Sequence, residues 1–483
     1  MQKYLRYSLA AVLAVLSAIL FFAILNYPAN GVLKFFAAVG ALGLPGGAIQ
    51  KLLKIEGEWG LMLVRTTNGL KLMERLAKRH PKFWRAFADF GLVFGFGALS
   101  AYMYKGIDRR VYFGTLALLL VSTFLMLPLI LPVAFSVISG LATGTATSAS
   151  GRTYAGISVL QIAFTLLLLV GGVTIAGILS ILANSAAILA AIISFIGNTG
   201  GGALQRAAPG ATALIPGQNI PLFEGLIALI VILVVHEGAH GILARLHKIK
   251  LKSAGVVLFG ILPVGAFVDP DEKTLQKSAS LKQRDVLVAG STANFATSIA
   301  AFLLLIAFIY ATAPVQDNRV FISGVADGVN IPTGAILQKV NGVQINSIYD
   351  LVKAKDKIAP LSAVVVETDK GTYSVKTNDN SAIGIFLTSV SGRPFLPLPF
   401  AWGLYVYSNS FVAGYGWLSF IYTVLALIFV LNFLIGSVNM MPIPVFDGQR
   451  LISLAVPHKL AMRIITYAVA AAFIINLLPW LWH

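Results

Sequence analysis

The chain has 483 residues, of which 57% are hydrophobic and only 11% are charged. Soluble domains are about 45–50% apolar and about 25% charged, so this composition excludes a soluble protein and indicates a polytopic membrane protein. The formal net charge of +17 would suit nucleic-acid binding, but the basic residues gather in loops between apolar runs and no nucleic-acid module accompanies them. The absence of cysteine excludes disulfides, thiol catalysis and cysteine zinc ligands.

Apolar runs long enough to cross a bilayer, about 20 residues each, recur along the chain. The first run exceeds the length of a signal-peptide core, so we interpret it as a retained anchor. Residues 31–48 are ambiguous, and residues 156–197 could make two passes separated near Gly177 or Asn184. The number of spans therefore stays open. The clearest runs are 5–26, 111–138, 222–244, 286–312, 412–438 and 460–482, with a shorter run, bounded by charge, at 88–104.

Loop charges predict the orientation of the chain. Residues 51–86 carry nine Lys or Arg against three Glu, and residues 245–285 carry eight basic against four acidic residues, which places both loops in the cytoplasm by the positive-inside rule. Residues 313–398 have no long apolar run and balance eight basic against seven acidic residues. The predicted parts are an N-terminal multi-pass region of unknown role at 1–221, a membrane core at 222–312 and 399–483, and a water-exposed insert at 313–398.

The insert alternates short strand-like stretches with turns. Residues 364–375 predict a hairpin that turns at Asp369-Lys370-Gly371, and residues 347–357 predict a short helix. Residues 334–345, GAILQKVNGVQI, resemble the core of PDZ domains of membrane-associated and periplasmic proteases, although those usually carry Gly-Asp at the position of Gly334-Ala335. The resemblance implies that an extended peptide adds to the sheet edge. The alternative is a small spacer without a ligand.

A candidate metal site lies near the end of the run 222–244. His236-Glu237-Gly238-Ala239-His240 is an H-E-x-x-H motif in a segment that must be helical to cross a membrane. Two residues four apart share one helix face about 6 Å apart, which suits two imidazoles on one zinc ion with Glu237 beside them as a general base. The alternative is that the histidines bond to neighbouring helices and Glu237 pairs with a lysine. The other histidines, at 80, 247, 458 and 483, lack ligand spacing and are expected at headgroups or in water.

A third ligand is required, because a catalytic zinc ion has three protein ligands and an open position for water. Residues 439–448, NMMPIPVFDG, close a later apolar run, and Pro442 and Pro444 cannot continue a helix. Non-helical backbone at membrane depth is tolerated where it is buried in protein or lines a cavity. The broken helix would therefore deliver Asp447 inward. The alternative is a carboxylate at an ordinary helix end in the headgroup region.

Together these two segments resemble the site-2 protease family of intramembrane zinc metalloproteases. The resemblance covers residues 222–482 with the PDZ-like insert, and it implies an α-helical polytopic membrane protein that holds one zinc ion (Zn²⁺) per chain. It assigns the metal to His236, His240 and Asp447 and the catalytic base to Glu237. The family's glycine, followed four residues later by asparagine, matches Gly290 and Asn294, with Ser291 in place of the usual proline, and its membrane-dipping loop matches residues 256–268.

The resemblance implies an endopeptidase that hydrolyses peptide bonds in or near transmembrane segments of other membrane proteins, as in regulated intramembrane proteolysis. Asn294 and Asn439 are candidates to bind the substrate backbone or the oxyanion. An unwound substrate is expected to pair near residues 258–268. The partners would be transmembrane substrates, a peptide at the PDZ-like domain and the lipid bilayer of the cell membrane. The active site would lie near the cytosolic side and the PDZ-like domain outside the cytosol.

Two alternatives remain. A metal-ion transporter or a PDZ-bearing membrane scaffold could use His236, His240 and Asp447 without catalysis. A membrane zincin of the CAAX-processing type would need a downstream glutamate on an apolar helix, but only Glu272 and Glu367 follow Glu237, and neither lies in such a helix. Glu237 discriminates between a transporter and a protease, because only the protease needs a base beside its ligands.

Overall fold

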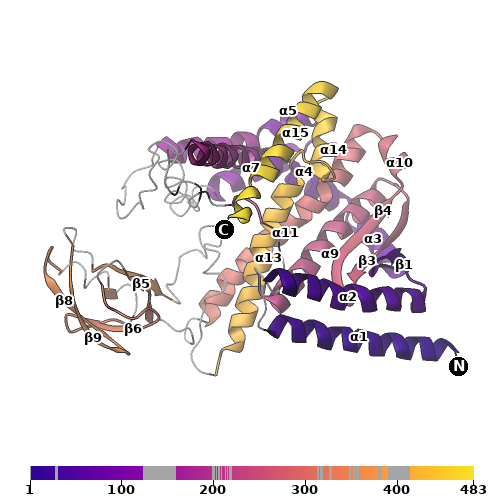
Figure 1. Cartoon of the computed structure of the whole chain (residues 1–483). Helices are drawn as coiled ribbons and strands as arrows, with labels where there is room; N and C mark the ends of the chain where they lie inside the picture. The colour runs from indigo at the N-terminus through magenta and orange to yellow at the C-terminus, as the bar shows by residue number, and fades with distance from the viewer. Residues whose placement is uncertain are drawn as a thin grey trace. The chain divides into compact units, whose positions relative to one another are not determined.

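The structure, a computed structural model, describes residues 2–27, 31–122, 159–197, 220–312 and 414–482, together with parts of 202–216 and most of 315–389. The chain forms two compact units: residues 1–300 with 427–483, and residues 301–426. The described residues are mostly helical and carry two separate antiparallel sheets (Figure 1). The predicted class, a polytopic helical protein with a small β-rich part, is confirmed.

Within the described residues, seven helices are long and apolar enough to cross a membrane. The ambiguous run 31–48 belongs to one of them, and the run 156–197 forms a single helical element that is interrupted at Gly172, where φ is 63°, and not at Gly177 or Asn184. Residues 109–122 are helical, while the rest of the predicted run 111–138 lies outside the described residues. The seven helices are α1 (Gln2–Asn26), α2 (Gly31–Leu53), α7 (Val159–Ile196), α9 (Leu222–Leu246), α11 (Ser280–Thr312), α13 (Trp417–Asn439) and α15 (Lys459–Ile475).

The shorter run 88–104 is buried in the first unit. It falls into α4 (Pro81–Phe96), which follows α3 (Thr67–Arg79), and into α5 (Leu99–Met103), with Gly97 between them at a φ of 56°. Leu92, Val93 and Phe96 are 0% exposed. At 16 residues α4 is too short to be a candidate span, so this charged-flanked segment is a core element.

One sheet joins distant parts of the first unit in the order β1-β2-β3-β4, with all neighbours antiparallel. The expected membrane-dipping loop forms β3 (Leu251–Phe259) and β4 (Leu262–Pro270), which turn at Gly260. Gly260 has a φ of 60°, and any side chain there would overlap the backbone of Leu42, so the turn needs glycine. The hairpin of β1 (Glu56–Glu58) and β2 (Leu61–Arg65) adds to β3 and leaves β4 at the edge.

The second unit holds the other sheet, in the order β10-β5-β6-β8-β9 with β7 paired to β6. Its core contains Ile322, Leu337, Val364 and Val366. The predicted hairpin is present and turns between Thr368 and Gly371, whereas the predicted helix 347–357 lies largely outside the described residues. The strands are β5 (Val320–Val325), β6 (Ile336–Val340), β7 (Val343–Gln344), β8 (Ala363–Thr368), β9 (Gly371–Lys376) and β10 (Ile385–Ser389).

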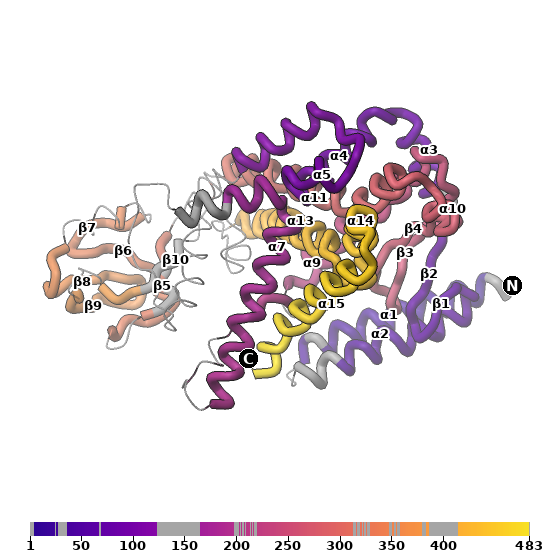
Figure 2. The backbone as a smooth tube through the Cα atoms, turned by 90° about the horizontal axis from the view of Figure 1, so that it is seen from above, coloured from indigo at the N-terminus to yellow at the C-terminus, as the bar shows by residue number. Residues whose placement is uncertain are grey.

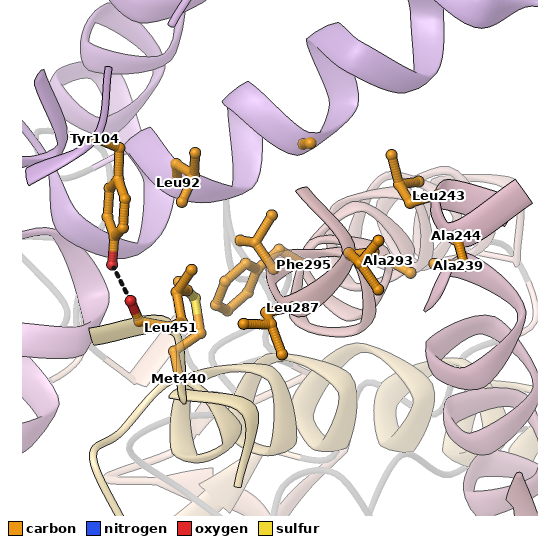
Figure 3. Packing of buried hydrophobic residues seen from close by; sticks show 14 of the residues in the cluster. Leu92, Tyr104, Ala239, Leu243, Ala244, Leu287, Ala293, Phe295, Met440 and Leu451 are labelled. Atoms are coloured by element: carbon orange, nitrogen blue, oxygen red, sulfur yellow. Dashed lines mark hydrogen bonds between the residues drawn. The ribbon is translucent and has the colours of Figure 1, made fainter. Parts of the chain in front are cut away.

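The largest core cluster of the first unit gathers side chains from α4, α9, α11 and the segment after α13 (Figure 3). Leu92, Leu243, Phe295 and Met440 meet there, and the hydroxyl of Tyr104 donates to the carbonyl of Leu451 at 3.3 Å. Leu451 lies on the short helix α14 (Asp447–Ala455), so the cluster braces the helix that begins at Asp447.

Helices α7 and α15 run side by side (Figure 2). Asn476 is fully buried between them, and its amide donates to Ser185 Oγ at 2.7 Å and to the Ile181 carbonyl at 3.0 Å. Asn184 donates to the Asn476 side-chain oxygen at 2.7 Å. Such buried amides fix the register of two apolar helices that have no hydrophobic preference for each other over lipid.

Candidate active site

Helix α9 carries the H-E-x-x-H motif through the middle of the first unit. Because α9 is helical across the motif, His236 and His240 lie one turn apart on one face, with ring centroids 4.8 Å apart and Nε2 atoms 3.2 Å apart. Each side chain is only 12% exposed. The two imidazoles therefore present the same nitrogen to one shared point.

Asp447 reaches the same point from the other end of the chain. Its Oδ2 lies 3.1 Å from His240 Nε2 and 3.4 Å from His236 Nε2. The three side chains each offer one ligand atom, and all these atoms lie within 4.8 Å of one another. The structure thus brings together the three residues that the sequence nominated as metal ligands.

The segment between α13 and α14 delivers Asp447. Helix α13 ends at Asn439, and the prolines at 442 and 444 prevent its continuation. Val445 adopts a left-handed φ of 80°, which a β-branched residue rarely does, and is 98% exposed. Gly448 lies against the backbone of Met440, where any Cβ would overlap. This sharp reversal starts α14 with the Asp447 side chain beside α9.

Hydrogen bonds set which nitrogen of His240 is available. The Nδ1 atom lies 2.7 Å from the Val286 carbonyl on α11, and because a carbonyl only accepts, Nδ1 carries the proton. The lone pair is then on Nε2, which faces Asp447. A metal-binding histidine uses its other ring nitrogen in this way to hold the ring in place.

Gly290 closes one side of the site. A Cβ at this position would overlap the imidazole atoms of both His236 and His240. The absence of a side chain at Gly290 therefore leaves space beside the two Nε2 atoms. The site offers two imidazole nitrogens and one carboxylate oxygen, a donor set that fits a zinc ion. Gly290 leaves the space that such an ion needs beside them.

Glu237 faces the sheet. Its Oε2 accepts a hydrogen bond of 3.0 Å from the backbone N–H of Val268 on β4. This contact ties the carboxylate to the edge strand of the sheet, next to the two histidines in the sequence. Nothing in the sequence indicated which residue of the loop would hold Glu237.

Asn294 and Asn439, the expected substrate or oxyanion contacts, both lie against the three-residue cluster. The Asn294 amide is 3.1 Å from His236 Nδ1, and the side chain is fully buried. Asn439 Nδ2 lies 2.9 Å from Asp447 Oδ2 and 3.0 Å from His236 Nε2. Both amides thus contact predicted ligands directly.

Asp447 accepts a hydrogen bond as a carboxylate does, because Asn439 Nδ2 donates to its Oδ2 at 2.9 Å. A carboxylate is the form that binds a cation.

A buried charge network lies beyond the site. Arg284 donates to Asp89 at 2.8 Å and to Asp285 at 2.9 Å, and it also bonds the Lys105 carbonyl. His247 Nε2 lies 2.8 Å from Asp285, and its side chain is only 7% exposed. The expectation that His247 lies in water is therefore wrong, because its side chain is buried against Asp285 of α11. No local sequence signal marked this network.

The model of peptidase family M50 matches residues 224–479, more than half of the chain. The chain belongs to peptidase family M50. The predicted membership of the site-2 protease family is confirmed, and M50 peptidases are zinc-dependent metalloproteases. This M50 chain is also 32% identical over 195 residues to an uncharacterized protein of Methanocaldococcus jannaschii. The match covers 39% of this chain and 51% of that protein, so it spans about half the length of the relative.

Proposed function

We propose that this chain is an intramembrane zinc metalloendopeptidase that hydrolyses peptide bonds in or near transmembrane segments of other membrane proteins. The observation that carries the proposal is that His236, His240 and Asp447 lie together, with their ligand atoms within 4.8 Å of one another. The two histidines belong to α9, a helix long and apolar enough to span a membrane. Family membership supports the metalloprotease activity. Regulated release of membrane-tethered proteins is the corresponding process.

His236 and His240 would hold one zinc ion through Nε2, and Asp447 through Oδ2. A zinc ion bound there supplies a Lewis acid and a water molecule of lowered pKa. Val286 supports this arrangement, because its carbonyl keeps His240 Nδ1 protonated and directs Nε2 to the site. Gly290 leaves the necessary space beside both rings.

Glu237 would act as the general base and then as the general acid. It would take a proton from the attacking water and pass that proton to the departing amine. The Val268 N–H bond to Oε2 supports this role, because it orients the carboxylate and leaves Oε1 available for proton transfer. The same bond links the base to β4.

Asn294 would position His236. The Asn294 Oδ1 atom is buried without a hydrogen-bond partner in the described part of the chain, while its nitrogen faces His236 Nδ1. A 180° rotation of the Asn294 amide exchanges its oxygen and nitrogen. Oδ1 then accepts a hydrogen bond from an N–H on His236 Nδ1, which leaves His236 Nε2 for the metal. Asn439, which donates to Asp447 Oδ2, would orient the carboxylate. Either amide would also contact the oxyanion of the substrate.

The edge of β4 would receive the substrate. A transmembrane helix has all its backbone bonds satisfied internally and must unwind before a peptide bond is exposed. An unwound segment can pair with the edge strand of a sheet, and β4 ends the sheet order within the described residues. The Glu237–Val268 bond supports this path, because it holds the base beside that strand.

The second unit would bind an extended peptide as a PDZ-like domain. Its end strands, β10 and β9, are the candidate edges for an added strand. By the positive-inside rule, the basic loop after α9 would be cytosolic, the active site would lie near that side, and the PDZ-like domain would be extracytosolic.

A cleavage assay on a panel of single-pass membrane segments tests the proposal. Glu237→Gln is expected to lower cleavage by about 10²–10⁴-fold, the usual contribution of a general base, while the protein still holds one zinc ion per chain by metal analysis. Glu224→Gln, on the first turn of the same helix, is the matched control and should cleave normally.

Two outcomes would contradict the proposal. Full cleavage by the Glu237→Gln variant would show that Glu237 is not the general base. A zinc content near zero after gentle extraction of the native protein would show that the three proposed ligands do not hold a zinc ion. Metal transport that is unchanged by Glu237→Gln, without cleavage of any segment, would favour the transporter.

A further inference from the structure

A pocket of about 540 Å³ lies between α14 and α15, outside the cluster of His236, His240 and Asp447. Its lining includes Lys459, Arg463 and Tyr467 of α15, and Pro444 and Gln449, which stand three residues before and two residues after Asp447. None of the lining residues is acidic. A concave site with two cations and no carboxylate attracts an anion.

The cations form a stripe on one helix face. Lys459, Arg463 and Tyr467 are spaced four residues apart, so they lie above one another on α15, and all three are exposed. Residues at this spacing can contact one ligand together. Arginine and lysine at successive turns suit a phosphate group, whose oxygens accept several charge-assisted hydrogen bonds.

The depth of the pocket identifies the source of the phosphate. Lys459 is the first residue of the candidate span Lys459–Leu481, and at about 1.5 Å per residue Arg463 and Tyr467 lie roughly 6 Å and 12 Å along it. These residues occupy the first turns of the span, next to the lipid headgroups, where basic and aromatic side chains gather. Leu460 and Ile464, each 61% exposed on the neighbouring stripe, offer apolar surface to acyl chains.

We propose that this pocket binds the phosphate of an anionic membrane phospholipid through Lys459 and Arg463. Because Pro444 and Gln449 belong to the segment that delivers Asp447, the bound lipid braces that segment. Basic pockets between transmembrane helices bind lipid headgroups in this way. The binding itself is independent of any proteolytic activity.

Thermal unfolding of the purified full-length protein in neutral detergent tests the inference. Adding phosphatidylglycerol should raise Tm by a few degrees in a saturable manner, and phosphatidylcholine should not. In Lys459→Gln/Arg463→Gln the apparent lipid affinity should fall on the order of tenfold or more, because each cation near an anionic headgroup contributes to the attraction. The charge-conserving swap Lys459→Arg/Arg463→Lys should retain the effect.

Lys273→Gln/Lys277→Gln is the matched control, since it removes two exposed lysines at the same spacing outside the pocket and should respond like the native protein. Equal responses to both lipids, or an unchanged response in Lys459→Gln/Arg463→Gln, would overturn the proposal. Inorganic phosphate that stabilises as well as the lipid at equal concentration would identify a free-phosphate site instead. Stabilisation by a glutamate-rich peptide but not by phosphatidylglycerol would identify a peptide site.

Discussion

At the scale of single residues, the proposed zinc site depends on a position without a side chain. Gly290 of α11 lies against the imidazoles of His236 and His240, so a methyl group there must displace both rings. The sequence motif marked Gly290 only through its spacing to Asn294. Its contact with the two histidines became evident from the packing of α11 on α9.

We expect Gly290→Ala to lose most of its zinc and its cleavage activity, because the two rings can no longer share one point. Metal analysis and the cleavage assay measure this effect. Gly238→Ala is the control within the motif itself, since a Cβ at Gly238 meets nothing within 4 Å. That variant should keep its zinc and gain up to about 1 kcal/mol of helix stability. Normal zinc content in Gly290→Ala would refute the proposed geometry.

A buried ion pair provides a second prediction at this scale. Arg284 is 4% exposed and Asp89 5%, so removing the carboxylate leaves a buried guanidinium less well compensated. Asp89→Asn should destabilise the protein by about 3 kcal/mol, toward the lower end of the usual range because Asp285 still pairs with Arg284.

Thermal unfolding in detergent measures this loss. The control is Glu74→Gln, which breaks an exposed i,i+4 pair with Lys78 and should leave stability unchanged within error. Equal effects of the two variants would mean that the buried network contributes nothing specific.

At the scale of elements, α4 is the unexpected part of the core. Gly91 of α4 lies on the side chain of Thr292, and Gly95 lies on Met440. These contacts join α4 to α11 and to the segment that delivers Asp447. The flanking charges of the run 88–104 suggested a short span, but close glycine contacts bury it against other helices.

Gly91→Ala should cost about 1–3 kcal/mol, because the added methyl group overpacks the contact between α4 and α11. The protein should also lose activity, since α4 supports Met440. Gly114→Ala, at an exposed position of the helix 109–122 with nothing within 4 Å, should lose neither stability nor activity. Tm and cleavage rate are the measurements, and an unaffected Gly91→Ala would show that α4 and α11 do not pack closely.

At the scale of the whole molecule, the region that matches the family packs against the N-terminal part of the chain. The family match covers residues 224–479, yet β1 and β2 complete the sheet of β3 and β4, and Asp89 compensates the charge of Arg284. The N-terminal part, for which the sequence indicated no role, thus supplies both a core element and two strands to the unit that contains the proposed site.

Residues 222–483 expressed alone should therefore bind no zinc and cleave nothing, because Arg284 loses one partner and the core cluster loses α4. Co-expression with residues 1–221 as a separate chain should restore both properties. The controls are the intact chain and residues 222–483 carrying Glu237→Gln with residues 1–221. Full zinc binding by residues 222–483 alone would contradict the prediction.

The sequence by itself determined the features that depend on short stretches of chain. Composition alone identified a polytopic membrane protein, helix geometry put His236 and His240 on one face, and the prolines at 442 and 444 predicted a break before Asp447. These inferences are reliable because local covalent geometry and solvation act on neighbouring residues, whatever the rest of the fold does.

Only the tertiary structure decided which distant surfaces meet. Four contacts join segments that are far apart in the chain: β2 pairs with β3, α4 packs in the core, Gly290 contacts the two histidines, and His247 is buried beside Asp285. No local pattern encodes such contacts, because glycines, charges and short strands are compatible with many partners. The partner is selected by packing and by pairing of buried charges over the whole molecule.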